Sequence, residues 1–136
     1  MKYSHIEDAF TFLSTVSPHE RHVYLNKETG ETYYVSMLDD LDESPDDLDA
    51  NEHYISVPHV NELNIGRNLV FDFISAYVPV ESERVRKIFR GKGAYYRFKS
   101  FLQAKGLLKG WYKFEKKATE EALRRWCREN NIVLEG

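Results

Sequence analysis

The spacing of apolar residues changes near residue 60, and this change restricts the folds open to the chain. Between about 22 and 58, apolar residues occur in short runs rich in β-branched and aromatic side chains. From about 62 onward they recur every three or four residues, as in an amphipathic helix. We therefore predict an α+β fold, in which a small antiparallel sheet packs with an N-terminal helix and several C-terminal helices.

The strand-rich part contains a predicted β-hairpin. Its two runs, 22–26 and 31–36, flank Lys27-Glu28-Thr29-Gly30, where the glycine takes the positive φ that a short turn needs. A third short strand, "HYISVP", is expected to end at Pro58. The predicted sheet is thus the hairpin plus one strand.

Helices are predicted before and after the strands along the sequence. Ser4 and Glu7 have the spacing of a capping box, and Pro18 ends the helix that follows them. Gly91 is interpreted as the C-cap of a later helix. The expected helices cover about 5–16, 62–78, 80–90, the segment after Gly93, and 109–129.

The last predicted helix allows two interpretations. Trp111, Phe114, Ala118, Ala122 and Trp126 form one apolar stripe, which favours a single helix over about 109–129. The alternative is a break at 117–119, with Thr119 as the N-cap of a second helix. The final residues "NIVLEG" are expected to form a frayed or short extended tail.

The segment 39–52 carries eight carboxylates and little apolar content. Mutual repulsion opposes a fixed path, so we expect an acidic mobile loop within a single domain that spans 1–136. Calcium binding is disfavoured, because a loop that starts at Asp40 lacks the glycine and the glutamate of an EF-hand. The five histidines also lack the tight spacing of metal ligands, so no metal or other cofactor is expected.

The remaining composition limits the class of protein. The single cysteine, Cys127, leaves no internal disulfide and favours a cytoplasmic location. No apolar run approaches the length of a membrane span. Neither a Gly-x-Ser-x-Gly elbow nor a phosphate-loop pattern is present, so the sequence favours a protein that binds a partner without catalysis.

The stretch "FRGKGAYYRFKSFLQAKG" mixes basic, aromatic and glycine residues. On a helical wheel, Ala94, Tyr95, Phe98, Phe101 and Leu102 share one arc and are expected to be buried. Tyr96 lies on the opposite side. Arg97 and Lys99 lie roughly 160 degrees apart, so they cannot form a single tight patch.

Charge is distributed unevenly along the chain. Residues 1–83 hold 4 basic and 17 acidic side chains, whereas residues 84–128 hold 15 basic and 3 acidic ones. The basic part favours nucleic acid as the partner, and protein–protein interaction through the charged faces is the alternative. The candidate anion- or nucleic-acid-binding residues are Lys92, Gly93, Tyr96, Arg97, Lys99, Lys109 and Lys113.

Several short segments match one known family. They are Thr29-Gly30-Glu31 after a strand, "FDFI", "GKGAYYRFKSFL", Trp111-Tyr112 with Phe114, and Trp126 shortly before Ile132. On these segments the chain resembles the bacterial uncharacterised protein family UPF0158. Tyr96 stands where a basic residue is expected in that family, and Ser100 stands where an aspartate is expected. The resemblance implies a bacterial single-domain protein and supplies no catalytic residues.

Overall fold

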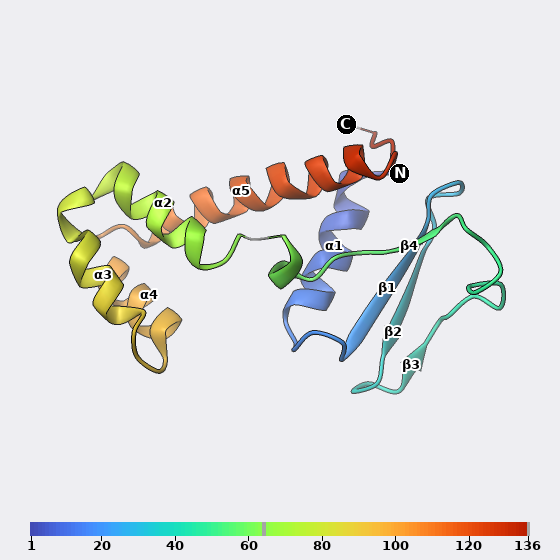
Figure 1. Cartoon of the computed structure of the whole chain (residues 1–136), viewed down its shortest axis with the longest axis horizontal. Helices are drawn as coiled ribbons and strands as arrows, with labels where there is room; N and C mark the ends of the chain where they lie inside the picture. Colours follow the sequence, from blue (N-terminus) through green and yellow to red (C-terminus); the bar gives the residue numbers. More distant parts are fainter. Residues whose placement is uncertain (64, 136) are drawn as a thin grey trace. The chain divides into compact units, whose positions relative to one another are not determined.

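The structure is a computed structural model that describes residues 1–63 and 65–135 (Figure 1). The chain is an α+β protein, as the sequence predicts. It divides into two compact units. The first takes the described residues of Met1–Asn64 and Glu120–Gly136, and the second is Ile65–Thr119. The sequence boundary between them falls inside one helix, and the single-domain interpretation stays a prediction.

The first unit contains a four-stranded antiparallel sheet with the strand order β3-β2-β1-β4 (Figure 1). The predicted hairpin and the third strand are confirmed. The sheet also has a two-residue strand, β3, inside the acidic segment for which the sequence predicts a loop. The strands are β1 (Arg21–Asn26), β2 (Thr32–Ser36), β3 (Leu41–Asp42) and β4 (Tyr54–Ser56).

The turn between β1 and β2 is held by one buried side chain. The amide oxygen of Asn26 accepts hydrogen bonds from the backbone N–H groups of Glu28 (2.9 Å) and Thr29 (3.2 Å). Gly30 has φ +79° and donates its N–H to the carbonyl of Asn26 at 2.8 Å. A glycine is needed here because L-residues, which have a Cβ atom, rarely adopt positive φ. These contacts set the register of the hairpin.

Helix α1 (Tyr3–Ser14) packs against β1 and β2. It buries one apolar face made of Ile6, Ala9, Phe10 and Leu13. The expected capping box at Ser4 is wrong, because the helix begins earlier, with Lys2 as its N-cap and no side-chain cap. A short 3-10 helix, η1 (Val60–Glu62), follows β4.

The end of helix α5 (Leu108–Glu129) and the C-terminal tail complete the first unit. Asn131 takes a left-handed conformation (φ 61°), and Ile132 donates its N–H to the carbonyl of Cys127 at 2.8 Å. This is the Schellman pattern of a helix C-terminus. The tail is extended and bonded to the N-terminus, since Glu135 donates its N–H to the carbonyl of Met1 at 2.8 Å.

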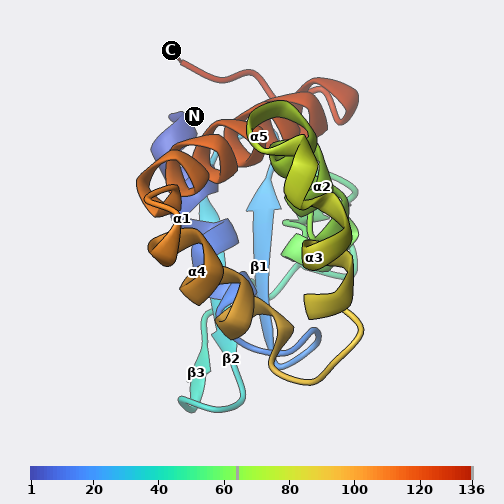
Figure 2. The same cartoon turned by 90° about the vertical axis from the view of Figure 1, so that its left-hand side faces the viewer.

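The second unit contains helices joined by loops and has no strand among its described residues (Figure 2). Helix α5 is continuous, so the interpretation as one helix is confirmed and the N-cap at Thr119 is wrong. The helix expected at 62–78 begins later, after Gly66. The other elements are α2 (Arg67–Tyr77), the 3-10 helix η2 (Pro79–Glu81), α3 (Ser82–Ile88) and α4 (Ala94–Ala104).

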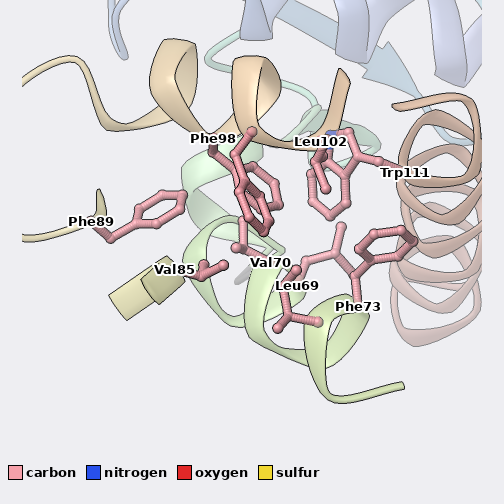
Figure 3. Close-up of a cluster of buried hydrophobic side chains, with 10 residues drawn as sticks. Leu69, Val70, Phe73, Val85, Phe89, Phe98, Leu102 and Trp111 are labelled. Carbon is pink, nitrogen blue, oxygen red and sulfur yellow. The ribbon is translucent and has the colours of Figure 1, made fainter. Parts of the chain in front are cut away.

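Aromatic rings fill the core of this unit (Figure 3). Trp111 of α5 is 1% exposed and makes edge-to-face contacts with Phe73 of α2 (5.4 Å between centroids) and Phe98 of α4 (5.2 Å). Tyr96 is 79% exposed, as the helical wheel predicts. The expected burial of Tyr95 is wrong, because this side chain is 45% exposed. Its ring packs edge-to-face against Phe89, with 5.3 Å between the ring centroids.

The loop before α4 also differs from expectation. Gly91 does not act as the C-cap of α3, which ends at Ile88 with Phe89 as its C-cap. The glycine with the left-handed conformation is Gly93 (φ 67°), which directly precedes α4. The freedom that only glycine offers is therefore used where the chain enters α4 rather than where it leaves α3.

Candidate nucleic-acid interface

The first half of α5 has two chemically different faces. Trp111 and Phe114 belong to the aromatic core, and the opposite side carries exposed polar residues at the spacing i, i+3, i+4 and i+7. On a helix of 3.6 residues per turn, this spacing confines the side chains to an arc of about 100 degrees. The exposed residues on this arc are Lys109, Tyr112, Lys113 and Lys116.

A side chain of helix α4 contacts this face of α5. The ammonium of Lys99 lies 5.6 Å from the centroid of the Tyr112 ring, in a cation–π contact. Because this contact joins α4 to α5, side chains from two helices of the same unit form one surface. We call it the lysine–tyrosine surface, and it consists of Lys99, Lys109, Tyr112, Lys113 and Lys116.

Few acidic groups counter the charge of this unit. Residues 65–119 hold thirteen basic and four acidic side chains, a net charge of +9. Two of those carboxylates are engaged elsewhere. Glu81 lies 3.3 Å from the Lys105 ammonium, and Glu83 lies 2.5 Å from the Arg86 guanidinium. Among the described residues, none of the four surface lysines has a carboxylate within ion-pair distance.

Glu115 of α5 is a carboxylate on which the charge of Lys99 acts. Its side chain is half-buried, and burial raises the pKa of the carboxyl group, while the Lys99 ammonium acts in the opposite direction. Burial raises the pKa of the Tyr95 hydroxyl, and the charge of Glu115 raises it further. The Lys99 ammonium is therefore close enough to Glu115 to lower the pKa of that carboxyl group, although the described residues show no ion pair between the two.

The structure brings some of the predicted site residues together. Lys99, Lys109 and Lys113 share the lysine–tyrosine surface, and Tyr96 lies one turn before Lys99 on the same side of α4. Sequence reasoning missed Tyr112 and Lys116. The signal was the spacing of "KGWYKFEK", which repeats a polar residue on each turn of the helix.

The other predicted site residues lie at the start of α4. The guanidinium of Arg97 folds back and donates a hydrogen bond to the carbonyl of Lys92. It occupies the space that a side chain at Gly91 would need. Gly93 precedes the first turn of α4 and provides no side-chain cap. The Arg97 guanidinium is thus directed at its own loop, away from the Lys99 side of the helix.

The first unit offers a different kind of feature. A pocket of about 470 Å³ lies beside the end of α5, and Arg124, Cys127, Arg128 and Ile132 are among its lining residues. Cys127 is 1% exposed, and burial raises the pKa of its thiol. Within the described chain, no three potential metal-ligating side chains gather at one point.

The fold and the surface define the class of protein: an α+β chain with a small antiparallel sheet and a basic helical unit. The chain belongs to the uncharacterised protein family UPF0158, whose family model matches residues 2–135. This confirms the resemblance found in the sequence. Neither a curated protein nor a solved structure matches the chain. Of the helices in residues 1–63 and 65–135, none combines the length and apolar content needed to cross a bilayer.

Proposed function

We propose that this protein binds nucleic acid without catalysis, through the lysine–tyrosine surface. The observation that supports the proposal is that four lysines from α4 and α5, none with an ion-pair partner among the described residues, share one surface in a unit of net charge +9. Phosphate neutralisation by lysine releases condensed counterions, and this release dominates non-specific affinity for nucleic acid. The pI near 6.0 of the whole chain is compatible with such binding, because the acidic residues are concentrated outside residues 65–119.

The number of lysines limits the strength of binding. Each neutralised phosphate contributes roughly −0.9 to the log–log salt slope on duplex DNA and roughly −0.7 on single strands. Four lysines acting together would give a slope of about −3 to −4. We therefore expect weak affinity that does not depend on sequence and falls steeply with salt.

A second candidate function, protein binding, is supported by different residues. Met37 and Leu38 follow β2 and are 80% and 59% exposed, and Asp39 and Asp40 come directly after them. An exposed apolar pair beside carboxylates suits a partner that offers an apolar contact and a basic rim. This segment contributes nothing to the lysine–tyrosine surface.

The test of nucleic-acid binding compares two substitutions that change the net charge equally. Lys113→Gln removes a lysine of the surface, and Lys105→Gln removes a lysine of the same unit that is paired with Glu81. Binding is measured by fluorescence anisotropy of the full chain with labelled oligonucleotides. For Lys113→Gln, the log–log salt slope should be less negative by about 0.7 to 0.9. The Lys105→Gln slope should stay near that of the unsubstituted protein.

Two results would contradict the proposal. One is the absence of binding to single- or double-stranded DNA or RNA at about 50 mM salt, where electrostatic attraction is strong. The other is an equal effect of the two substitutions, which would show that net charge matters and the surface does not. The first result would leave protein binding as the function to pursue.

A further inference from the structure

We propose that the lysine–tyrosine surface takes single-stranded nucleic acid and that Tyr112 is a platform on which one base stacks. This inference depends on the proposed function and specifies its substrate. Tyr112 lies between Lys109 and Lys116 along the same arc of α5, and its side chain is 45% exposed. An aromatic ring among phosphate-binding lysines is the arrangement by which proteins bind unpaired strands.

The contact between Lys99 and Tyr112 suggests how a nucleotide would be accommodated. The Lys99 ammonium, 5.6 Å from the ring centroid, covers one face of the ring in the free protein. A base also binds through its π face, so it can take the place of the ammonium over the ring. Lys99 has a long, flexible side chain, and its displaced ammonium would remain within reach of the phosphate attached to that base.

Helix α4 offers a second ring near the same lysine. Tyr96 is 79% exposed and precedes Lys99 by one helical turn, on the side of α4 from which Lys99 reaches Tyr112. A duplex keeps its bases inside the stack and cannot present them to either tyrosine. The surface should therefore prefer single strands over duplexes with the same number of phosphates.

The test uses the full chain and three labelled ligands with the same number of phosphates: a mixed-sequence single strand, an abasic strand of the same length, and a duplex of half that length. The unsubstituted protein should bind the single strand at least about 5-fold more tightly than the abasic strand. Tyr112→Ala should weaken binding of the single strand by about 5- to 20-fold and leave the abasic strand unaffected. The salt slope should not change, because stacking releases no counterions.

Two control variants separate stacking from other effects of the substitution. Tyr112→Phe keeps the ring and should bind like the unsubstituted protein. Tyr77→Ala removes a tyrosine of α2 that is 61% exposed and packs against Phe73 of the core, so it should leave affinity for the single strand unchanged. Far-UV circular dichroism confirms that each variant is folded.

The outcomes distinguish this inference from the proposed function. Equal affinity of the unsubstituted protein for the single strand and the abasic strand would overturn base stacking and keep phosphate binding. This comparison needs no variant, so it holds even if Tyr112→Ala fails to fold. A preference for the duplex would also overturn the inference. If none of the three ligands bound at about 50 mM salt, the proposed function itself would be wrong.

Discussion

At the scale of single residues, Glu115 has an environment that opposes its ionised form. Burial raises the pKa of its carboxyl group, so the folded protein holds the proton more tightly than the unfolded chain does. The charged carboxylate therefore costs stability at neutral pH. This cost disappears as the pH falls through the raised pKa toward the ordinary value of a glutamate.

Glu115→Gln should consequently make the protein more stable at pH 7. The gain should shrink as the pH falls through the raised pKa, and it should vanish below the ordinary value, where the native side chain is neutral in both states. Urea denaturation at pH 7 and pH 4 measures the free energy of unfolding at both ends. The matched control is Glu83→Gln, an exposed carboxylate paired with Arg86. A lower stability of Glu115→Gln at pH 7 would show that its attraction to Lys99 outweighs burial.

At the scale of elements, the two glycines that flank the start of α5 have opposite roles. Gly106 ends the turn after α4 with φ +72°, a conformation that other L-residues rarely adopt. Gly110 lies inside α5, where a Cβ atom would meet the Phe73 ring at an ordinary distance of 3.9 Å. A glycine within a helix costs stability through the backbone freedom of the unfolded chain.

Alanine at these two positions should therefore have effects of opposite sign. Gly110→Ala should raise the free energy of unfolding by about 0.5 kcal/mol, a modest gain because the position is close to the helix terminus. Gly106→Ala should lower it by about 1 kcal/mol, because it forces a left-handed conformation on an L-residue. Chemical denaturation gives both values. A destabilised Gly110→Ala variant would mean that the Phe73 side of α5 has no room for a methyl group.

Local patterns predicted the long elements better than the short ones. The hairpin could be found because its turn residues and β-rich runs act over neighbouring positions. Strand β3 could not, because it has two residues and is defined by pairing with β2, through Val35↔Asp42 and Ser36↔Leu41. Its sequence lies in a run of carboxylates that has no strand propensity of its own.

The candidate site was predictable only within each helix. Helical periodicity separates Trp111 from Lys113 and shows that Arg97 and Lys99 diverge. It cannot show that Lys99 of α4 reaches Tyr112 of α5, because that contact depends on how two helices pack. Tyr112 was not predicted as a site residue for the same reason. A single exposed ring is a candidate for base stacking only when lysines surround it, and Lys99 comes from another helix.

At the scale of the whole molecule, helix α5 contributes residues to both compact units, and this bears on whether the two units unfold together. The sequence boundary between Thr119 and Glu120 lies within α5, whose backbone hydrogen bonds continue from Leu108 to Glu129. Helix formation is cooperative, so melting one end of a continuous helix weakens the adjacent turns. We therefore predict a single unfolding transition, consistent with the interpretation of the chain as one domain.

Two natural probes allow this prediction to be tested in one variant. Trp126→Phe leaves Trp111, in the core of the second unit, as the only tryptophan. Cys127 reports on the first unit, because its thiol is 1% exposed and burial raises its pKa, so it should react with thiol reagents only after that unit opens. Tryptophan fluorescence and thiol reactivity across a urea series should give coincident midpoints. Midpoints that differ by more than the experimental error would show that the two units unfold independently. A mutation such as Gly110→Ala would then change the stability of the second unit only.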